Sequence, residues 1–148
     1  MAILRRADLI VFGVFAKMRV LIVEDEPTTA AIVQANLQNS GYTCDVADLG
    51  EVGLTLAETY GDYDIIILDL MLPDLKGQDI LRQLRADGVP TPVLVLTGVR
   101  QLDVRRACDE SGADDFLTKP FEHPELIARI DALLGRAHEP PAFSHKTH

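Results

Sequence analysis

The 148-residue sequence has no Trp, only two cysteines, and few aromatic residues, which make up 5% of the chain. Cys44 and Cys108 stand far apart, without a C-x-x-C pair or a histidine at metal-ligand spacing. They therefore predict neither a disulfide framework nor a zinc site, and we expect a reducing, cytoplasmic compartment. Basic residues are also scarce, because 14 Lys and Arg oppose 23 Asp and Glu to give a net charge of −9. Nucleic-acid binding needs a basic patch, so we expect no direct DNA binding by this chain.

Long hydrophobic runs are missing as well. An apolar stretch over Leu9–Ala16 follows two arginines, as in a signal peptide, but it is too short to span a membrane. Met18 opens a strand-like segment, so we expect residues 1–17 to be a loose extension. Gly, Pro and polar residues break the pattern near the other end, and residues 138–148 are expected to be a linker or tail. One domain, residues 18–137, fits the remaining length.

Short apolar runs alternate with amphipathic segments along this domain. Continuously apolar runs are typical of strands that are buried on both faces of a parallel sheet. Strands are expected at Arg19–Val23, Thr43–Ala47, Asp64–Leu68, Val93–Leu96 and Asp115–Thr118. Helices are expected at Pro27–Gln38, Glu51–Thr59, Gln78–Ala86, Gln101–Ser111 and Pro124–Leu134. This order predicts an α/β fold, a single doubly wound five-stranded parallel sheet with helices on both faces.

Polar side chains follow four of these strands, at the sheet edge where open α/β folds bind ligands. They are Glu24 and Asp25, Asp69, Thr97, and Lys119. A single carboxylate at the end of a strand is more often a helix cap. Polar residues after four strands of the same sheet, however, together indicate one functional site. Clustered carboxylates repel one another unless a cation compensates, and oxygen ligands favour Mg²⁺. The set predicts phosphoryl chemistry in which Asp69 is the nucleophile while Lys119 and Thr97 hold the phosphoryl oxygens.

Four segments carry a resemblance to a known family: VLIVEDE, IIILDLMLPDLKG, VLVLTG and GADDFLTKPF. In this order they resemble the receiver domain of two-component response regulators, from Met18 to about Ala137. The resemblance implies a flavodoxin-like (βα)5 fold with strand order 2-1-3-4-5. It also implies that a sensor histidine kinase or phosphotransfer protein donates a phosphoryl group to Asp69. Such a receiver catalyses only its own phosphorylation and slow dephosphorylation, so we expect a signalling protein and not an enzyme.

The resemblance also implies a ligand set for Mg²⁺. Asp25 and Asp69 would bind the ion directly, Glu24 would act mainly through a bound water, and the backbone carbonyl of Met71 would supply a further ligand. The side chains of Met71 and Val99 cannot hydrogen-bond an attacking water, so we expect slow loss of the phosphoryl group.

Further residues of this chain match the positions that form a conformational switch in the family. The Lys119–Pro120 bond is expected to be cis, which would direct the ammonium inward. Thr97 and Phe116 match the switch residues, and Phe116 stands where many members have Tyr. Without that hydroxyl, the switch would act through packing alone.

The last two helices and the fifth strand resemble those of winged-helix (OmpR/PhoB-like) transcription regulators. The resemblance implies a homodimer that forms on phosphorylation through a two-fold symmetric contact and that controls a transcription output. The matching charged residues, among which Arg105 pairs with Glu125 and Asp115 with Arg129, are Arg105, Asp114, Asp115, Glu125 and Arg129. Asp131 departs from the pattern, because a basic residue is common at that position.

The same residues leave alternative functions open. Too few residues follow Ala137 for an output domain, so a single-domain phosphorelay shuttle is the main alternative to a receiver taken from a longer regulator. A haloacid-dehalogenase-type phosphatase would carry a second acid two residues after its nucleophile, where this chain has Met71. A nucleotide or flavin module would need a glycine-rich phosphate loop, and the sequence has none. A degenerate receiver that only binds partners fits less well, because all five key side chains are present.

Overall fold

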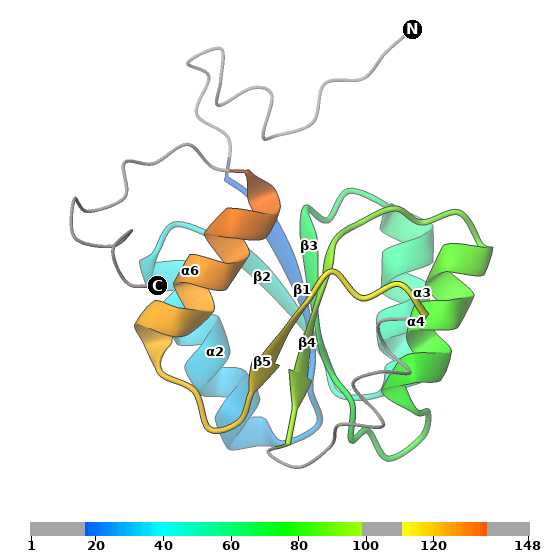
Figure 1. Cartoon of the computed structure of the whole chain (residues 1–148), viewed down its shortest axis with the longest axis horizontal. Coiled ribbons are helices and arrows are strands. Elements are labelled where there is room, and N and C mark those ends of the chain that lie inside the picture. The colour runs from blue at the N-terminus through cyan, green and yellow to red at the C-terminus, as the bar shows by residue number, and fades with distance from the viewer. Residues whose placement is uncertain (1–16, 99–110, 136–148) are drawn as a thin grey trace, which may run out of the picture.

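A computed structural model describes residues 17–98 and 111–135 of the chain (Figure 1). The strands are β1 (Arg19–Val23), β2 (Thr43–Ala47), β3 (Ile65–Asp69), β4 (Val93–Thr97) and β5 (Asp115–Thr118). The helices are α2 (Pro27–Asn39), α3 (Gly50–Tyr60), α4 (Gly77–Ala86) and α6 (His123–Leu134). Each bound lies within one residue of the sequence-based expectation. All but the last residue of the helix expected at Gln101–Ser111 lies outside the described residues, as do Arg105 and Val99.

The strands form one parallel sheet in the order β2-β1-β3-β4-β5, which confirms the predicted topology. β1 pairs with both β2 and β3, so that Val23 lies opposite Ala47 on one side and Leu68 on the other. Helices α2 and α6 cover one face of the sheet, and α3 and α4 cover the other (Figure 1). Because every pairing in the sheet is parallel, all strand ends of one kind meet at one edge.

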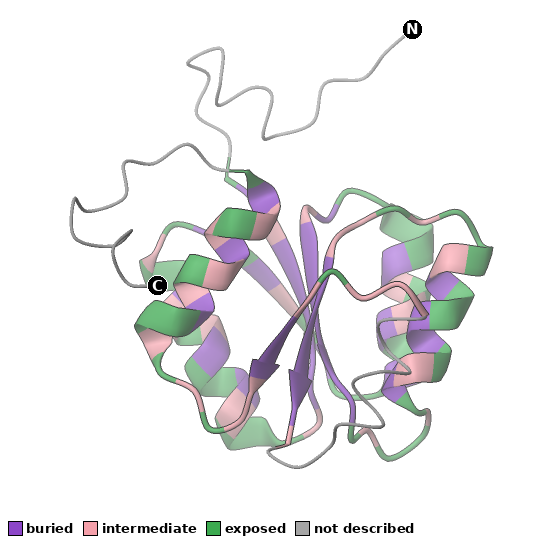
Figure 2. Cartoon of the chain, viewed as in Figure 1, coloured by how far each residue is buried: buried purple, intermediate pink, exposed green. Residues whose placement is uncertain are grey.

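The core has two halves, one on each face of the sheet (Figure 2). Val20 and Ile22 of β1 belong to the half that includes α2 and α6, whereas Leu21 and Val23 belong to the half that includes α3 and α4. Successive side chains of a strand point to opposite faces, so a strand covered on both sides must be apolar throughout. Among the residues that the structure describes, no helix combines the length and hydrophobicity that a membrane crossing requires.

Two glycines of helix α3 allow it to pack closely on β1 and on α4. A Cβ atom at Gly53 would lie 2.7 Å from Cγ2 of Val23, and one at Gly50 would lie 2.8 Å from Cδ1 of Ile80 in α4. Both distances are shorter than an ordinary contact between carbon atoms. The position of α3 therefore depends on the absence of side chains at these two residues.

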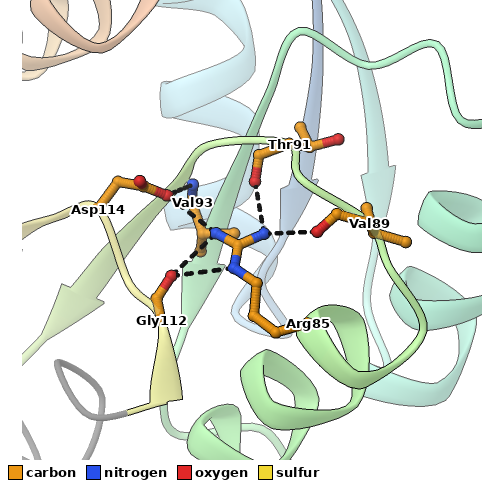
Figure 3. A network of polar contacts seen from close by, with 6 residues as sticks. All are labelled: Arg85, Val89, Thr91, Val93, Gly112 and Asp114. Atoms are coloured by element: carbon orange, nitrogen blue, oxygen red, sulfur yellow. Dashed lines mark hydrogen bonds and ion pairs between the residues drawn. The ribbon is translucent and has the colours of Figure 1, made fainter.

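A single arginine ties together the starting ends of β4 and β5 (Figure 3). The guanidinium of Arg85, in the last turn of α4, donates to the carbonyls of Val89 (2.8 Å), Thr91 (2.9 Å) and Gly112 (2.8 and 3.1 Å) and to the carboxylate of Asp114 (2.9 Å). The same carboxylate accepts the N–H of Val93 at 2.8 Å. The network lies at the edge of the sheet where the strands begin, opposite the edge that carries the polar strand ends.

Candidate functional site

The carboxyl ends of four strands bring the predicted polar residues to one edge of the sheet. Glu24 and Asp25 follow β1, Asp69 and Thr97 are the last residues of β3 and β4, and Lys119 directly follows β5. In Figure 1 this is the lower edge, toward which the arrows of β4 and β5 point. Parallel pairing without a break in register makes this gathering a direct result of the strand order.

Three carboxyl groups form the centre of the site. Glu24, Asp25 and Asp69 each offer an oxygen, and these oxygens lie within 4.8 Å of one another. Glu24 is 1% exposed and Asp69 is 3% exposed, whereas Asp25 is more open to solvent. A set of hard oxygen donors with one side open suits Mg²⁺, which retains waters when it binds to proteins. These residues could therefore hold a divalent cation.

Lys119 places a positive charge against two of these carboxyl groups. Its Nζ lies 3.0 Å from Oε1 of Glu24 and 3.3 Å from Oδ1 of Asp69. Its backbone N–H donates to the carbonyl of Thr97 at 2.7 Å, and the bond from Lys119 to Pro120 is cis. The ammonium thus joins the ends of β1, β3 and β5.

The electrostatics of the site show an excess of negative charge. Burial, together with a hydrogen bond shared with Asp69, raises the pKa of the Glu24 carboxyl above its ordinary value, although the bond from Lys119 acts in the opposite direction. Burial alone would lower the pKa of the Lys119 ammonium, but its hydrogen bond to Glu24 and the charge of Asp69 outweigh burial and raise it. One ammonium does not balance three carboxyl groups, so an added cation would be stabilised here.

A hydroxyl group and an aromatic ring lie on the neighbouring strands. Thr97 is 3% exposed, and its Oγ1 lies 3.5 Å from the carbonyl of Gly98, which is long for a hydrogen bond. The hydroxyl is thus weakly held and can turn toward a ligand. Phe116, opposite Val95 in the sheet, is buried in the half of the core that includes α3 and α4. Its ring can move only if its neighbours in that half rearrange.

The connection between β3 and α4 enters the site beside Asp69. The N–H of Met71 lies 3.3 Å from Oδ1 of Asp69, and Met71 is 65% exposed. Three residues later, Oδ1 and Oδ2 of Asp74 accept the N–H groups of Gly50 (2.8 Å) and Glu51 (2.9 Å) at the start of α3. The sequence did not lead us to predict a role for Asp74. The one available signal was that the helix begins after Leu49, which has no side chain able to cap it.

The described residues matched to a dimer contact, which are all of the set except Arg105, form two separate sets of contacts. Arg129 Nη1 lies 2.9 Å from Oδ1 of Asp115, and Arg129 Nη2 lies 4.0 Å from Oε2 of Glu125, so these three side chains form one charged patch within the chain. Asp114, the residue before Asp115, instead binds Arg85. Asp131 of α6 accepts a hydrogen bond from the hydroxyl of Tyr42.

The fold and the site together define a class of protein: a flavodoxin-like α/β domain with an acidic, lysine-paired site at the carboxyl edge of its sheet. Residues 20–131 match the family model described as the response regulator receiver domain. The chain belongs to this family, which confirms the family predicted from the sequence.

Similar curated proteins share most of this domain. The cell cycle transcriptional regulator CtrA of Caulobacter vibrioides is 44% identical over 120 residues, which cover 81% of this chain and 52% of that protein. The cell cycle response regulator CtrA of Brucella ovis is also 44% identical over 120 residues, covering 81% of this chain and 51% of that protein. The chain therefore spans about half the length of these curated relatives.

Solved structures of receiver domains have the same fold. The receiver domain of a Francisella response regulator has a TM-score of 0.75 and 34% identity, and the match covers 82% of this chain and 100% of that one. The receiver domain of a sensor histidine kinase from Pseudomonas aeruginosa has a TM-score of 0.75 and 31% identity, covering 81% of this chain and 99% of that one. The latter structure contains a magnesium ion coordinated in its active-site cleft.

Proposed function

We propose that the Asp69 carboxylate of this chain accepts a phosphoryl group from a sensor histidine kinase or phosphotransfer protein. A carboxylate oxygen of Asp69 attacks phosphorus, the bond from phosphorus to the donor nitrogen breaks, and its electron pair leaves with the donor. The observation that carries this proposal is the pairing of Asp69, which is 3% exposed, with an ammonium at 3.3 Å inside a carboxylate cluster. A buried nucleophile with a matched cation beside it suits transfer of an anionic group.

Glu24, Asp25 and Asp69 would hold Mg²⁺, with the backbone carbonyl of Met71 as a further ligand. When bound, the ion supplies positive charge that offsets the charge of the phosphoryl oxygens. The acidic cluster supports this assignment, because a group of three oxygen donors with one open side fits Mg²⁺ better than zinc or copper. The magnesium in the related Pseudomonas aeruginosa receiver domain supports it as well.

Lys119 and Thr97 would hold the transferred group. The Lys119 ammonium already contacts Asp69, so a phosphoryl oxygen attached to Asp69 falls within its reach. The weakly held hydroxyl of Thr97 can donate to a second oxygen. Phosphorylation adds about −1.5 to −2 charge, which draws both groups toward Asp69 and away from their present partners.

The result would be a shift between two arrangements of the β4–β5 edge. Thr97 ends β4, and the buried ring of Phe116 lies on the adjacent strand. Because Phe116 has no hydroxyl, its part in the switch would depend on the space that Thr97 opens or fills. The chain catalyses its own phosphorylation and slow dephosphorylation, and no other reaction.

We further propose that the chain is the receiver of a cytoplasmic regulator of transcription, with residues 18–137 as its domain. The 44% identity to a cell cycle transcriptional regulator supports this output. On phosphorylation, the patch of Asp115, Glu125 and Arg129 would form part of a homodimer contact. The ion pair between Asp115 and Arg129 is then exchanged for pairs between two copies.

Incubating the purified chain with acetyl phosphate, with and without Mg²⁺, tests this function. Intact mass and sedimentation are followed together for the parent, for Asp69→Asn, and for the control Asp79→Asn, which alters an exposed carboxylate on α4. We expect a Mg²⁺-dependent phosphoryl adduct in the parent and the control, lost in Asp69→Asn, with a shift to dimer. An adduct without dimerisation would favour a phosphorelay shuttle, and no adduct in the parent would overturn the phosphoacceptor assignment.

A further inference from the structure

The connection from β3 to α4 is a short loop whose base is closed by backbone contacts. Met71 and Lys76 form an isolated antiparallel bridge, and the N–H of Gly77 donates to the carbonyl of Leu70 at 3.4 Å. A Cβ at Gly77 would lie 2.5 Å from Cδ2 of Leu70, so the two ends of the loop meet at a distance that only glycine allows. These contacts hold the two ends together, and Leu70, Leu72 and Leu75 pack with the half of the core that includes α3 and α4.

Asp74, near the tip of this loop, attaches it to another element. Its two carboxylate oxygens accept the N–H groups of Gly50 at 2.8 Å and Glu51 at 2.9 Å. These are the first two residues of α3, whose own N-cap residue makes no side-chain hydrogen bond. The backbone N–H of Glu51, and then that of Gly50, lower the pKa of the Asp74 carboxyl, so it stays ionised at neutral pH and complements the helix dipole.

The helix that receives Asp74 is itself firmly placed. Gly53, one turn further along α3, packs so closely on Val23 that a Cβ atom would lie 2.7 Å from its side chain. Val23 is the residue before Glu24, at the end of β1. The bonds from Asp74 therefore fix the loop to a helix that is seated on the strand leading into the site.

At its other end, the same loop touches the phosphoacceptor. The N–H of Met71 points to Oδ1 of Asp69 at 3.3 Å, the oxygen that also faces the Lys119 ammonium. A shift of the loop would therefore change which donors face that carboxylate. It would also move the Met71 carbonyl, which the proposed function makes a ligand of the metal.

We propose that Asp74 is a positioning residue for Asp69: by pinning the loop of residues 70–76 to the start of α3, it keeps the Met71 backbone in place beside the phosphoacceptor carboxylate. This inference rests on the proposed function. It assigns Asp74 no contact with the phosphoryl group and no part in the bond changes.

Three variants separate positioning from loss of charge or of stability. Asp74→Ala removes both bonds, and Asp74→Asn keeps one carbonyl acceptor but meets the second N–H with a donor. Asp79→Ala removes an equal charge from α4, where the exposed side chain of Asp79 bonds to Arg82. Each is compared with the parent at a temperature where circular dichroism shows complete folding, so that a lower stability cannot reduce the rate.

Two readouts are taken from each variant. The first is the maximal rate of phosphorylation by acetyl phosphate, and the second is the Mg²⁺ concentration that half-saturates the unphosphorylated protein, followed through the Met71 amide resonance. For Asp74→Ala we expect the rate to fall about ten-fold and the half-saturating Mg²⁺ concentration to rise by a similar factor, as for other groups that orient metal ligands. Asp74→Asn should lie between the parent and Asp74→Ala, and Asp79→Ala should match the parent.

The outcomes distinguish this inference from the proposed function. Parent-like rate and Mg²⁺ affinity in Asp74→Ala would reduce Asp74 to a helix cap and overturn the inference while the phosphoacceptor assignment stands. Equal losses in Asp79→Ala would also overturn it, because net charge would then explain the effect. If the parent takes up no phosphoryl group, the proposed function fails, and the Mg²⁺ titration alone decides whether Asp74 orders the loop.

Discussion

Replacing Gly53 with alanine would place a methyl group between α3 and β1. The new Cβ would lie 2.7 Å from Cγ2 and 2.9 Å from Cγ1 of Val23, both well inside van der Waals contact. Val23 is 2% exposed and belongs to a strand with neighbours on both sides, so its side chain has little room to move. The helix or the strand end must therefore shift.

Two opposing contributions set the size of the effect. Alanine in a helix interior is favoured over glycine by about 1 kcal/mol. Overpacking of a close-packed site costs roughly 1–3 kcal/mol, and the contact with two methyl groups places this case in the upper half of that range. We therefore expect Gly53→Ala to lower the free energy of unfolding by about 1–2 kcal/mol.

The variant Val23→Ala supplies the matching space. Alone it should cost about 2 kcal/mol, through lost burial and the cavity it leaves. In the double variant the methyl group at residue 53 occupies part of that cavity and the helix preference of alanine is retained. The two changes should therefore be non-additive by about 1–2 kcal/mol, in the stabilising direction.

The free energy of unfolding of the parent, the two single variants and the double variant is measured by urea unfolding. Far-ultraviolet circular dichroism is the probe, because the chain has no Trp for fluorescence. The urea dependence of the free energy should be unchanged, so that midpoints report stability directly. A Gly53→Ala protein more stable than the parent would refute the close approach. So would a double variant whose changes add to within about 0.5 kcal/mol.

Three further predictions test other parts of the molecule. Arg85→Lys should lower the free energy of unfolding by about 2 kcal/mol, because one ammonium cannot bind all the carbonyls that the guanidinium group reaches. A midpoint of urea unfolding equal to that of the parent would contradict the importance of this network. Burial, and then the charge of Asp45, raise the pKa of the Cys44 thiol to about 11. The unfolded chain then releases this proton first, so stability should fall as the pH rises from about 9 toward about 11, and Cys44→Ala should show a shallower fall. Met71→Asn should shorten the lifetime of the phosphorylated chain in a phosphate-release assay, because the amide can hydrogen-bond an attacking water, and an unchanged lifetime would remove Met71 from that role.

The sheet and the centre of the site were predictable because both depend on local pattern and strand order. Continuous runs such as Ile65–Leu68 indicate strands that are covered on both faces, and parallel strands place their carboxyl ends at one edge. Asp69 and Lys119 could thus be assigned to one site although 50 residues separate them in the sequence. The structure adds that the ammonium lies nearer to Glu24, at 3.0 Å, than to Asp69, at 3.3 Å.

The contacts of Asp74 and Arg85 could not be predicted in the same way. Asp74 bonds to backbone N–H groups more than 20 residues earlier, and Arg85 bonds mainly to backbone carbonyls, which every residue carries. The residue types in the sequence therefore do not indicate these contacts. Asp114 is a similar case, because the sequence matched it to a dimer contact but did not indicate that its carboxylate also bonds within the chain, to Arg85 and to the N–H of Val93.

The arginine network holds one end of the β4–β5 pair, so any movement of the pair is larger at the other end. Arg85 clamps the ends where these strands begin, while Thr97 and Lys119 stand at the ends where they finish. β4 has five residues, so its length is about 16 Å, and a rotation of about 4° about the clamped end moves the tip by roughly 1 Å. A pull on Thr97 would therefore displace the ends of these strands more than their starts, and because β4 is also paired with β3, the β3–β4 pairing has to adjust with it.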